Sequence, residues 1–316
     1  MFIAVILIIH CLTLTTKAAT SKVTVNIEIV NATTLKISWN SIKGYNQYKV
    51  YRSTNYSGTY KLIKETNQTT FMDKGLERGN AYFYKIKAIN NNKVLSSTIL
   101  YKYLKVEGIP NILDSSKINS DKDTVIIVST KNTVTSLANV SFYRKRNDKY
   151  KLEFSTIGYV GEDGIGKIKE GDGNTPTGTF GFSNAFGISE APNGIVIPYT
   201  QVNSSHWVVS DSNSKYYNKF VSTKDVKKDW KDSYGEQLSK YTLSYQYALF
   251  IDYNKESVKN KGSAIFLHCY AGKKYTIGCI AIPAEKMKYL LTRLVLDRYG
   301  NISSQIIINT YDKLLN

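Results

Sequence analysis

Hydrophobic and polar side chains alternate with a period of two along residues 21–104. Leu35, Ile37 and Trp39 make one such run, and residues 82–88 make another. Short stretches rich in Gly, Ser and Asn separate the runs and indicate turns. Alternation of this kind is typical of strands with one buried face. Several short strands at regular spacing therefore predict an antiparallel β-sandwich.

The pattern changes after residues 105–122, where Gly, Pro, Ser and charged residues predict a linker. Short apolar runs beyond it are typical of buried strands. We expect such strands at Val125–Val128, Val140–Tyr143, Tyr150–Thr156, Tyr245–Tyr253, Ala264–Leu267 and Gln305–Thr310. Met287, Leu290 and Leu294 follow Pro283 at helical spacing and predict a helix. The chain is therefore expected to be mainly β, with one or two helices in residues 123–316.

One segment concentrates residues with catalytic chemistry. His268 ends an apolar run, and Cys279 follows eleven residues later, directly after Gly278. An imidazole can take the proton of a thiol, and the thiolate is the reactive form of cysteine. We therefore expect an ionised sulfur within reach of the His268 ring. Backbone N–H groups near Gly278 and Cys279 are candidates for binding an oxyanion.

Other interpretations of these residues remain open. A lone His at the end of a strand can be a satisfied core residue, and a buried Cys can act as a small hydrophobic side chain. Cys269 and Cys279 could form a disulfide in an oxidising compartment. Strand alternation turns Cys269 away from the face of His268. No metal site is predicted, because the whole chain has three His and three Cys and no CxxC pair.

The N-terminus resembles a secretory signal peptide. Residues 2–14 are apolar apart from His10 and Cys11, and Ala18 and Ala19 are small residues suited to cleavage. We therefore expect a secreted protein with four segments. These are a signal peptide (1–19), a sandwich domain (20–104), a linker (105–122) and a C-terminal domain (123–316).

The formal net charge of +17 implies attraction to polyanions. No cluster of basic residues interleaved with aromatic residues marks a nucleic-acid surface, so nucleic acid is not an expected partner. For an exported protein, anionic cell-wall polymers or membrane surfaces are the better candidates.

Two motifs resemble a known family. Thr276-Ile277-Gly278-Cys279, preceded by His268, resembles the catalytic motif of YkuD-type L,D-transpeptidases, and Gly171–Phe180 (GDGNTPTGTF) resembles a second signature of that family. The resemblance covers roughly residues 123–309. The sandwich resembles a fibronectin type III domain, in which Tyr82 would be the tyrosine of the corner motif.

The resemblance implies a peptidoglycan L,D-transpeptidase that forms cross-links through a cysteine acyl-enzyme on tetrapeptide stems. Cys279 would be the nucleophile, His268 the base and then the acid, and Gly278 part of the oxyanion site. Thr276, Trp207 and Tyr217 are candidate substrate contacts, although packing on the sheet is the alternative for the two aromatic residues. The resemblance implies no cofactor or metal, and carbapenem-type inhibitors would acylate the cysteine.

The sequence departs from the family at one position. Many members have Arg or Asn two residues after the Cys, where this chain has Ala281. Donor and acceptor preferences are therefore not transferred. An L,D-carboxypeptidase, which uses water as acceptor, and a non-catalytic cell-wall-binding protein remain the alternatives.

Overall fold

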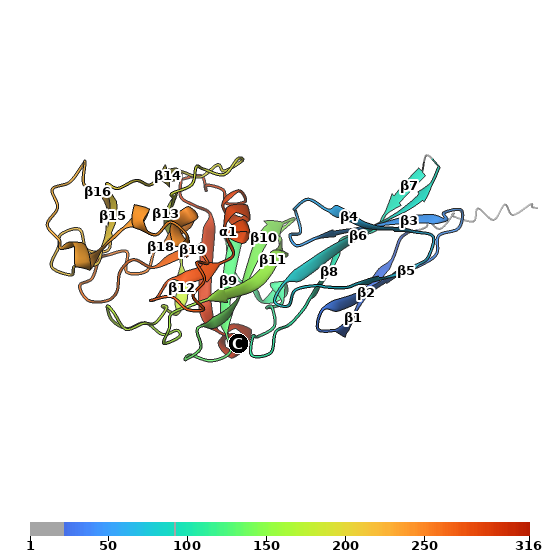
Figure 1. Cartoon of the computed structure of the whole chain (residues 1–316), viewed down its shortest axis with the longest axis horizontal. Helices are drawn as coiled ribbons and strands as arrows, with labels where there is room; N and C mark the ends of the chain where they lie inside the picture. Colours follow the sequence, from blue (N-terminus) through green and yellow to red (C-terminus); the bar gives the residue numbers. More distant parts are fainter. Residues whose placement is uncertain (1–21, 92) are drawn as a thin grey trace, which may run out of the picture.

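The structure, a computed structural model, describes residues 22–91 and 93–316, and the predicted signal peptide (1–19) lies outside them. The chain forms two parts that follow each other along the long axis of the molecule (Figure 1). The N-terminal part holds strands β1 to β8, and the C-terminal part holds the remaining strands and both α-helices.

The N-terminal part is a β-sandwich. One sheet has the order β1-β2-β5, and the other has the order β4-β3-β6-β7, with β8 also paired to β6. The strands are β1 (Val25–Asn31), β2 (Thr34–Trp39), β3 (Gln47–Ser53), β4 (Lys61–Thr66), β5 (Thr70–Asp73), β6 (Ala81–Asn90), β7 (Lys93–Ser96) and β8 (Leu100–Tyr103). The predicted alternation explains the core, because Leu35, Ile37 and Trp39 on β2 are all buried between the sheets.

Tyr82 makes the contact expected of a tyrosine corner. Its hydroxyl oxygen accepts a hydrogen bond from the backbone N–H of Glu77 at 2.8 Å and donates to the Glu77 carbonyl at 3.2 Å. The phenol thereby fixes the crossing between β5 and β6. The prediction of an N-terminal sandwich is confirmed.

The segment predicted as a linker packs against the C-terminal part. It contains one short 3-10 turn (Ser115–Lys117), and the side chains of Ile109 and Leu113 are buried. The Tyr143 hydroxyl donates to the Leu113 carbonyl at 2.6 Å. The segment is therefore a docked connection and not an extended tether.

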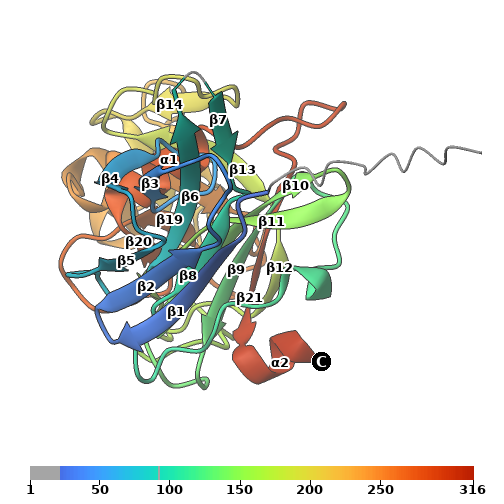
Figure 2. The same cartoon turned by 90° about the vertical axis from the view of Figure 1, so that its right-hand side faces the viewer.

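The C-terminal part is built on a mixed sheet with the order β12-β21-β9-β10-β11-β20-β19-β18-β13-β14. Strands β21 and β9 run parallel and lie side by side in Figure 2. In spatial order the strands are β12 (Gly178–Phe180), β21 (Ser304–Thr310), β9 (Thr124–Thr130), β10 (Leu137–Arg146), β11 (Lys149–Tyr159), β20 (Ile280–Ile282), β19 (Phe266–Cys269), β18 (Ala248–Ile251), β13 (Phe182–Gly187) and β14 (Tyr199–Gln201).

Both faces of this sheet are covered, which explains its continuous apolar runs. On β9, Ile126 and Val128 face a core that includes α1 (Ala284–Leu291). Val125 and Ile127 face the other way, into a cluster that also contains Phe83 of the sandwich. The predicted helix after Pro283 is confirmed.

A smaller sheet and several turns complete the C-terminal part. The small sheet has the order β16-β15-β17, formed by β15 (His206–Val209), β16 (Phe220–Ser222) and β17 (Gly235–Gln237). A short helix, α2 (Tyr311–Leu315), ends the chain. The strand predicted at Tyr245–Tyr253 is shorter, because β18 begins at Ala248 and Ser244–Gln246 form a 3-10 turn.

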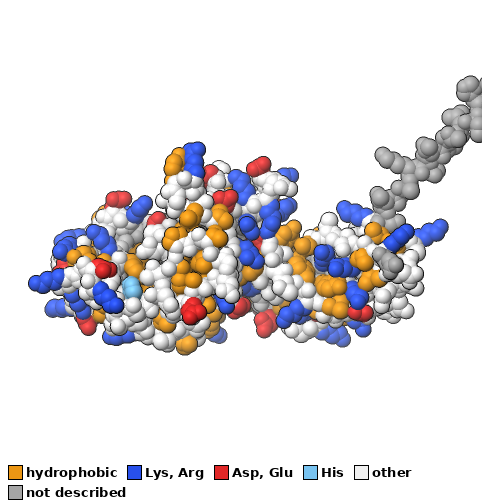
Figure 3. Space-filling view, turned by 90° about the horizontal axis from the view of Figure 1, so that it is seen from above, with side chains coloured by type: hydrophobic (Ala, Val, Ile, Leu, Met, Phe, Trp, Pro, Cys, Tyr) orange, Lys and Arg blue, Asp and Glu red, His pale blue; other side chains and the backbone are white. Residues whose placement is uncertain are grey.

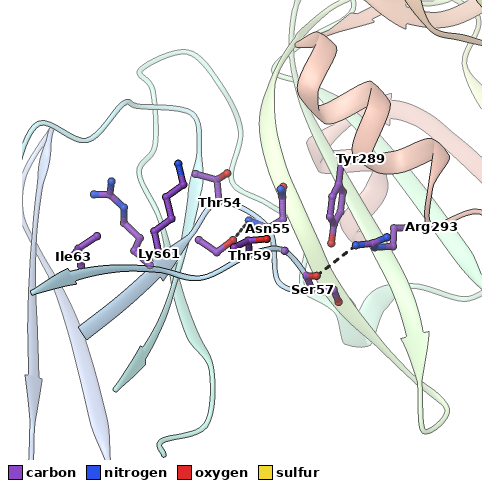
Figure 4. Close-up of a pocket in the computed structure, with 11 residues that line it drawn as sticks. Thr54, Asn55, Ser57, Thr59, Lys61, Ile63, Tyr289 and Arg293 are labelled. Atoms are coloured by element: carbon purple, nitrogen blue, oxygen red, sulfur yellow. Dashed lines mark hydrogen bonds between the residues drawn. The ribbon is translucent and has the colours of Figure 1, made fainter. Parts of the chain in front are cut away.

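Glu153 joins the two parts. Its carboxylate is fully buried on β11 and accepts hydrogen bonds from Ser57 of the sandwich and from Arg146 and Tyr289 of the C-terminal part. Beside this contact lies a cavity of about 620 Å³ between the two parts. Figure 4 shows its lining, in which Arg293 donates to the Ser57 carbonyl; no Cys or His lines this cavity.

Lys and Arg side chains are spread along the whole face shown in Figure 3, without a single basic patch. None of the helices in residues 22–316 is long and apolar enough to cross a membrane.

Candidate active site

Two neighbouring strands place Cys279 and His268 on one face of the large sheet. β19 and β20 run parallel, with His268 opposite Ala281 and Leu267 opposite Ile280. Side chains two residues apart in an extended chain point to the same face. Cys279 lies two residues before Ala281, so its side chain shares the face of His268.

Both residues line one cavity of about 430 Å³. Aromatic, charged and small side chains form much of the rest of the wall, and the cavity opens to solvent. The other lining residues are Glu162, Glu236, Tyr241, Ser244, Tyr245, Ala271, Lys273, Tyr275, Thr276, Ile277 and Ala281. The candidate dyad is therefore deep in the protein but accessible to a substrate.

The His268 ring is held in one orientation. Its Nδ1 lies 2.9 Å from the backbone carbonyl oxygen of Cys269, which can only accept a hydrogen bond. Nδ1 therefore carries the proton, and Nε2 is left with a lone pair. The Tyr245 ring packs edge-on against the imidazole, with centroids 5.5 Å apart. Burial lowers the pKa of His268 to about 4.

The Cys279 thiol is not bonded to the imidazole. Its Sγ accepts a hydrogen bond from the Phe266 N–H at 3.3 Å, and the S–H donates to the Ala264 carbonyl at 3.2 Å. Burial raises the pKa of this thiol well above its ordinary value, and the nearby charge of Glu236 raises it further. Burial therefore favours the neutral thiol and the neutral imidazole, against the expectation of an ionised sulfur.

Cys269 lies on the opposite face of β19, as strand alternation predicts. It is fully buried in the main core, where burial raises the pKa of its thiol to about 12. Both Cys269 and Cys279 are free thiols. The alternative of a disulfide between them is not realised.

The loop before Cys279 is shaped by two threonines. Gly278 has φ +141°, and a Cβ there would lie 3.2 Å from the carbonyl oxygen of Asn174. The Thr276 hydroxyl donates to the Cys279 carbonyl at 2.6 Å. From the GDGNTPTGTF segment, the Thr175 hydroxyl donates to the Gly278 carbonyl at 2.8 Å. The two motifs, about a hundred residues apart in the chain, meet at the thiol loop.

These contacts change the predicted role of Gly278. Its backbone N–H donates to the Thr276 hydroxyl oxygen at 3.1 Å and is not free to bind an oxyanion. The backbone N–H of Cys279 remains the available donor. Gly278 serves the loop through its conformation.

Of the three candidate substrate contacts, only Thr276 lies at the cavity that holds Cys279 and His268. Thr276 lines the cavity, although its hydroxyl is used within the loop. Trp207 packs in a separate buried cluster with Val209 and Trp230, and Tyr217 donates from its hydroxyl to Glu170. Neither aromatic residue lines the cavity, and both are buried, as the packing alternative predicts.

Sequence reasoning missed Glu236 and Tyr245. Glu236 lies on β17 and reaches the cavity wall, where the Tyr245 hydroxyl donates to its carboxylate. Burial raises the pKa of Glu236 to about 7. Only the pairing of β17 with β15 brings this residue to the site, and no local motif announces it.

Within residues 22–316, no group of three or more His, Cys, Asp or Glu side chains is placed to hold a metal ion.

Comparisons with known proteins add little about this site. No family profile matches the chain, and no curated protein matches it. Solved structures similar to part of the chain include an Fn3-like protein from Clostridium thermocellum, with 28% identity and a TM-score of 0.24. The match covers 27% of this chain and 92% of the Clostridium chain. The sixth fibronectin type III domain of human fibronectin type III domain containing protein 3 (13% identity, TM-score 0.25) covers 28% and 87%.

Because these TM-scores are low, the description of the sandwich rests on its own strand pairing.

Proposed function

We propose that this protein is a peptidoglycan L,D-transpeptidase that forms a thioester between Cys279 and the third residue of a tetrapeptide stem. A neighbouring stem amine then takes the acyl group and forms a cross-link. The observation that carries this proposal is the shared cavity of Cys279 and His268, with Nδ1 of the imidazole fixed by the Cys269 carbonyl.

Acylation follows from this geometry. On substrate binding the Cys279 S–H leaves the Ala264 carbonyl and passes its proton to His268 Nε2 as Sγ attacks the stem carbonyl carbon. Because both groups start neutral, proton transfer accompanies the attack and no ion pair needs to form beforehand. The Cys279 N–H binds the oxyanion. The C–N bond then breaks, and the proton on Nε2 goes to the amine of the departing D-alanine.

Deacylation repeats these steps in the reverse sense. An acceptor amine attacks the thioester carbon and gives a proton to His268 Nε2. The C–S bond breaks, and the proton returns to Sγ. With water in place of the amine, the same intermediate yields an L,D-carboxypeptidase.

The experiment that tests acylation is mass spectrometry of the intact protein after mixing with a carbapenem. We expect a covalent adduct on the wild type. The Cys279→Ala variant should form none, whereas Cys269→Ala, the matched control, should still form one. A folded wild-type protein without an adduct would contradict the enzymatic proposal and favour a non-catalytic wall-binding protein.

Product analysis separates the two enzymatic activities. A tetrapeptide stem is incubated with and without a second stem that carries a free amine. Cross-linked dimer in the presence of the amine supports the transpeptidase. Tripeptide as the sole product under both conditions would assign the carboxypeptidase.

The proposed place of action is the outer face of the cell envelope. The apolar run at residues 2–14, followed by Ala18 and Ala19, supports export. The net charge of +17 supports attraction to anionic wall polymers. Retention on isolated cell walls that falls steeply with added salt is the expected result.

A further inference from the structure

The cavity contains a second ionisable group to which the mechanism above gives no role. Glu236 reaches the wall from β17 of the small sheet, whereas Cys279 and His268 come from the large sheet. Glu236 lies deep in the protein and keeps partial exposure because it faces the cavity. The cavity's other carboxylate, Glu162, is exposed.

The Glu236 carboxylate has an unused oxygen. Tyr245 donates to Oε2, and within residues 22–316 no hydrogen bond reaches Oε1. No Lys or Arg of the described residues forms an ion pair with Glu236, although Lys273 lines the same cavity. A carboxylate with little access to water and no cation favours a positively charged partner.

The acceptor of the proposed reaction is an amine that arrives from water as an ammonium ion. We infer that Glu236 binds this ammonium group and takes one of its protons, so that a neutral amine is delivered to the Cys279 thioester. This inference rests on the proposed function, because an acyl-enzyme must form before the amine can attack. It gives Glu236 a role in the second half of the reaction only.

The step balances as follows. The R–NH₃⁺ group gives one proton to the Glu236 carboxylate and becomes R–NH₂. Its nitrogen attacks the thioester carbon, the C–S bond breaks, and the second proton passes through His268 Nε2 to Sγ. The products are an amide, the Cys279 thiol and a protonated Glu236, which releases its proton to solvent.

The surroundings of Glu236 suit a base that works near neutral pH. Burial raises the pKa of Glu236 to about 7, the Tyr245 hydrogen bond opposes that rise, and the charge of Glu170 adds to it. The other titratable groups that line the cavity are Glu162, Tyr241, Tyr245, His268, Lys273, Tyr275 and Cys279. A base whose pKa is close to the working pH transfers protons most effectively.

The test separates acylation from transfer. Acyl-enzyme formation is measured by intact mass, and transfer by the rate at which a stem amine removes the acyl group. We expect Glu236→Gln to acylate within about twofold of the wild type and to transfer to the amine about 10²-fold more slowly or worse. Glu162→Gln, the matched control on the same cavity, should stay within about threefold in both steps.

Hydroxylamine, which is uncharged at neutral pH, sharpens the test. It needs no proton acceptor before attack, so it should remove the acyl group from Glu236→Gln nearly as fast as from the wild type. Normal stem-amine transfer by Glu236→Gln, or an equal loss of acylation and transfer, would overturn the inference. A wild type that forms no acyl-enzyme would remove the proposed function, and this inference with it.

Discussion

Two carboxylates, Glu153 and Glu236, are both withdrawn from bulk water, but their surroundings differ. Glu153 accepts from the Ser57 N–H (3.3 Å), the Ser57 hydroxyl (3.0 Å), Arg146 (2.8 Å) and Tyr289 (2.6 Å). Glu236 accepts from Tyr245 alone among the described residues, and it faces a cavity. The first joins two domains, and the second borders a thiol and an imidazole.

The difference shows how to tell a carboxylate that stabilises the fold from one that takes part in a reaction. A buried charge is tolerated when donors and an opposite charge surround it, as they do at Glu153. A carboxylate left with one donor is held closer to its neutral form, which is reflected in the raised pKa of Glu236. We therefore expect Glu153 to matter for stability and Glu236 for reactivity.

The largest expected effect is the loss of stability when Glu153 is removed. Glu153→Ala leaves Arg146, Ser57 and Tyr289 without their shared acceptor and should lower the free energy of unfolding by about 3 kcal/mol. Glu236→Ala leaves no cation unpaired and strands only the Tyr245 hydroxyl at the cavity wall, so it should change this free energy by about 1 kcal/mol. Urea denaturation followed by tryptophan fluorescence measures both. Equal losses of stability in the two variants would show that the number of hydrogen-bond donors around a carboxylate does not decide whether it stabilises the fold.

The next effect concerns the loop that carries Cys279. The Thr175 hydroxyl accepts from the Gly161 N–H and donates to the Gly278 carbonyl, so Thr175→Val leaves both groups unsatisfied. We expect a loss of about 1–3 kcal/mol in stability and acylation slower by about tenfold or more, because the thiol loses its fixed position. Thr177→Val, at an exposed position of the same segment, is the control. Unchanged acylation in Thr175→Val would mean that the loop holds its shape without this contact.

These residues show how far sequence alone can reach. The strand before His268, the helix after Pro283 and the opposite face of Cys269 follow from local periodicity. The motif at Thr276 and Gly278 was visible, but its hydrogen bonds required the loop geometry. Glu236 could not be found, because tertiary pairing alone brings it to Cys279. For Trp207 the sequence leaves substrate contact and packing both open, because an aromatic residue in a polar segment looks the same whether it packs or binds.

A smaller effect is the pH dependence of stability, to which Glu236 and His268 contribute with opposite signs. The pKa of Glu236 is raised from 4.5 to about 7, so the folded state holds more protons between these values and stability falls as pH rises. The pKa of His268 is lowered from 6.5 to about 4, so the unfolded state holds more protons and stability rises over that range. In the wild type the two slopes, each at most about 1.4 kcal/mol per pH unit, oppose each other between about pH 4.5 and 6.5.

Single substitutions should reveal each slope. Relative to the wild type, Glu236→Gln should gain stability as pH rises toward 7, and His268→Gln should gain stability as pH falls toward 4. Thermal denaturation at a series of pH values measures the differences, in which the other carboxylates cancel. If the stability differences of the two variants changed with pH in the same direction, the pKa values of Glu236 and His268 would not be shifted in opposite directions.

The smallest effect comes from two tyrosine hydroxyl groups, which a Tyr→Phe substitution removes while the ring keeps its packing. Tyr289→Phe takes one donor from Glu153 and leaves Arg146 and Ser57 in place, so a stability loss of about 1 kcal/mol is expected, with acylation unchanged. Tyr245→Phe removes the hydroxyl that donates to Glu236, so the pKa of that carboxylate should rise further. The pH profile of transfer to an amine should then move upward while stability stays within about 1 kcal/mol. If the pH profile moved in Tyr289→Phe and stayed in place in Tyr245→Phe, Glu153 and not Glu236 would be the base. Only the residue that titrates during turnover can shift this profile.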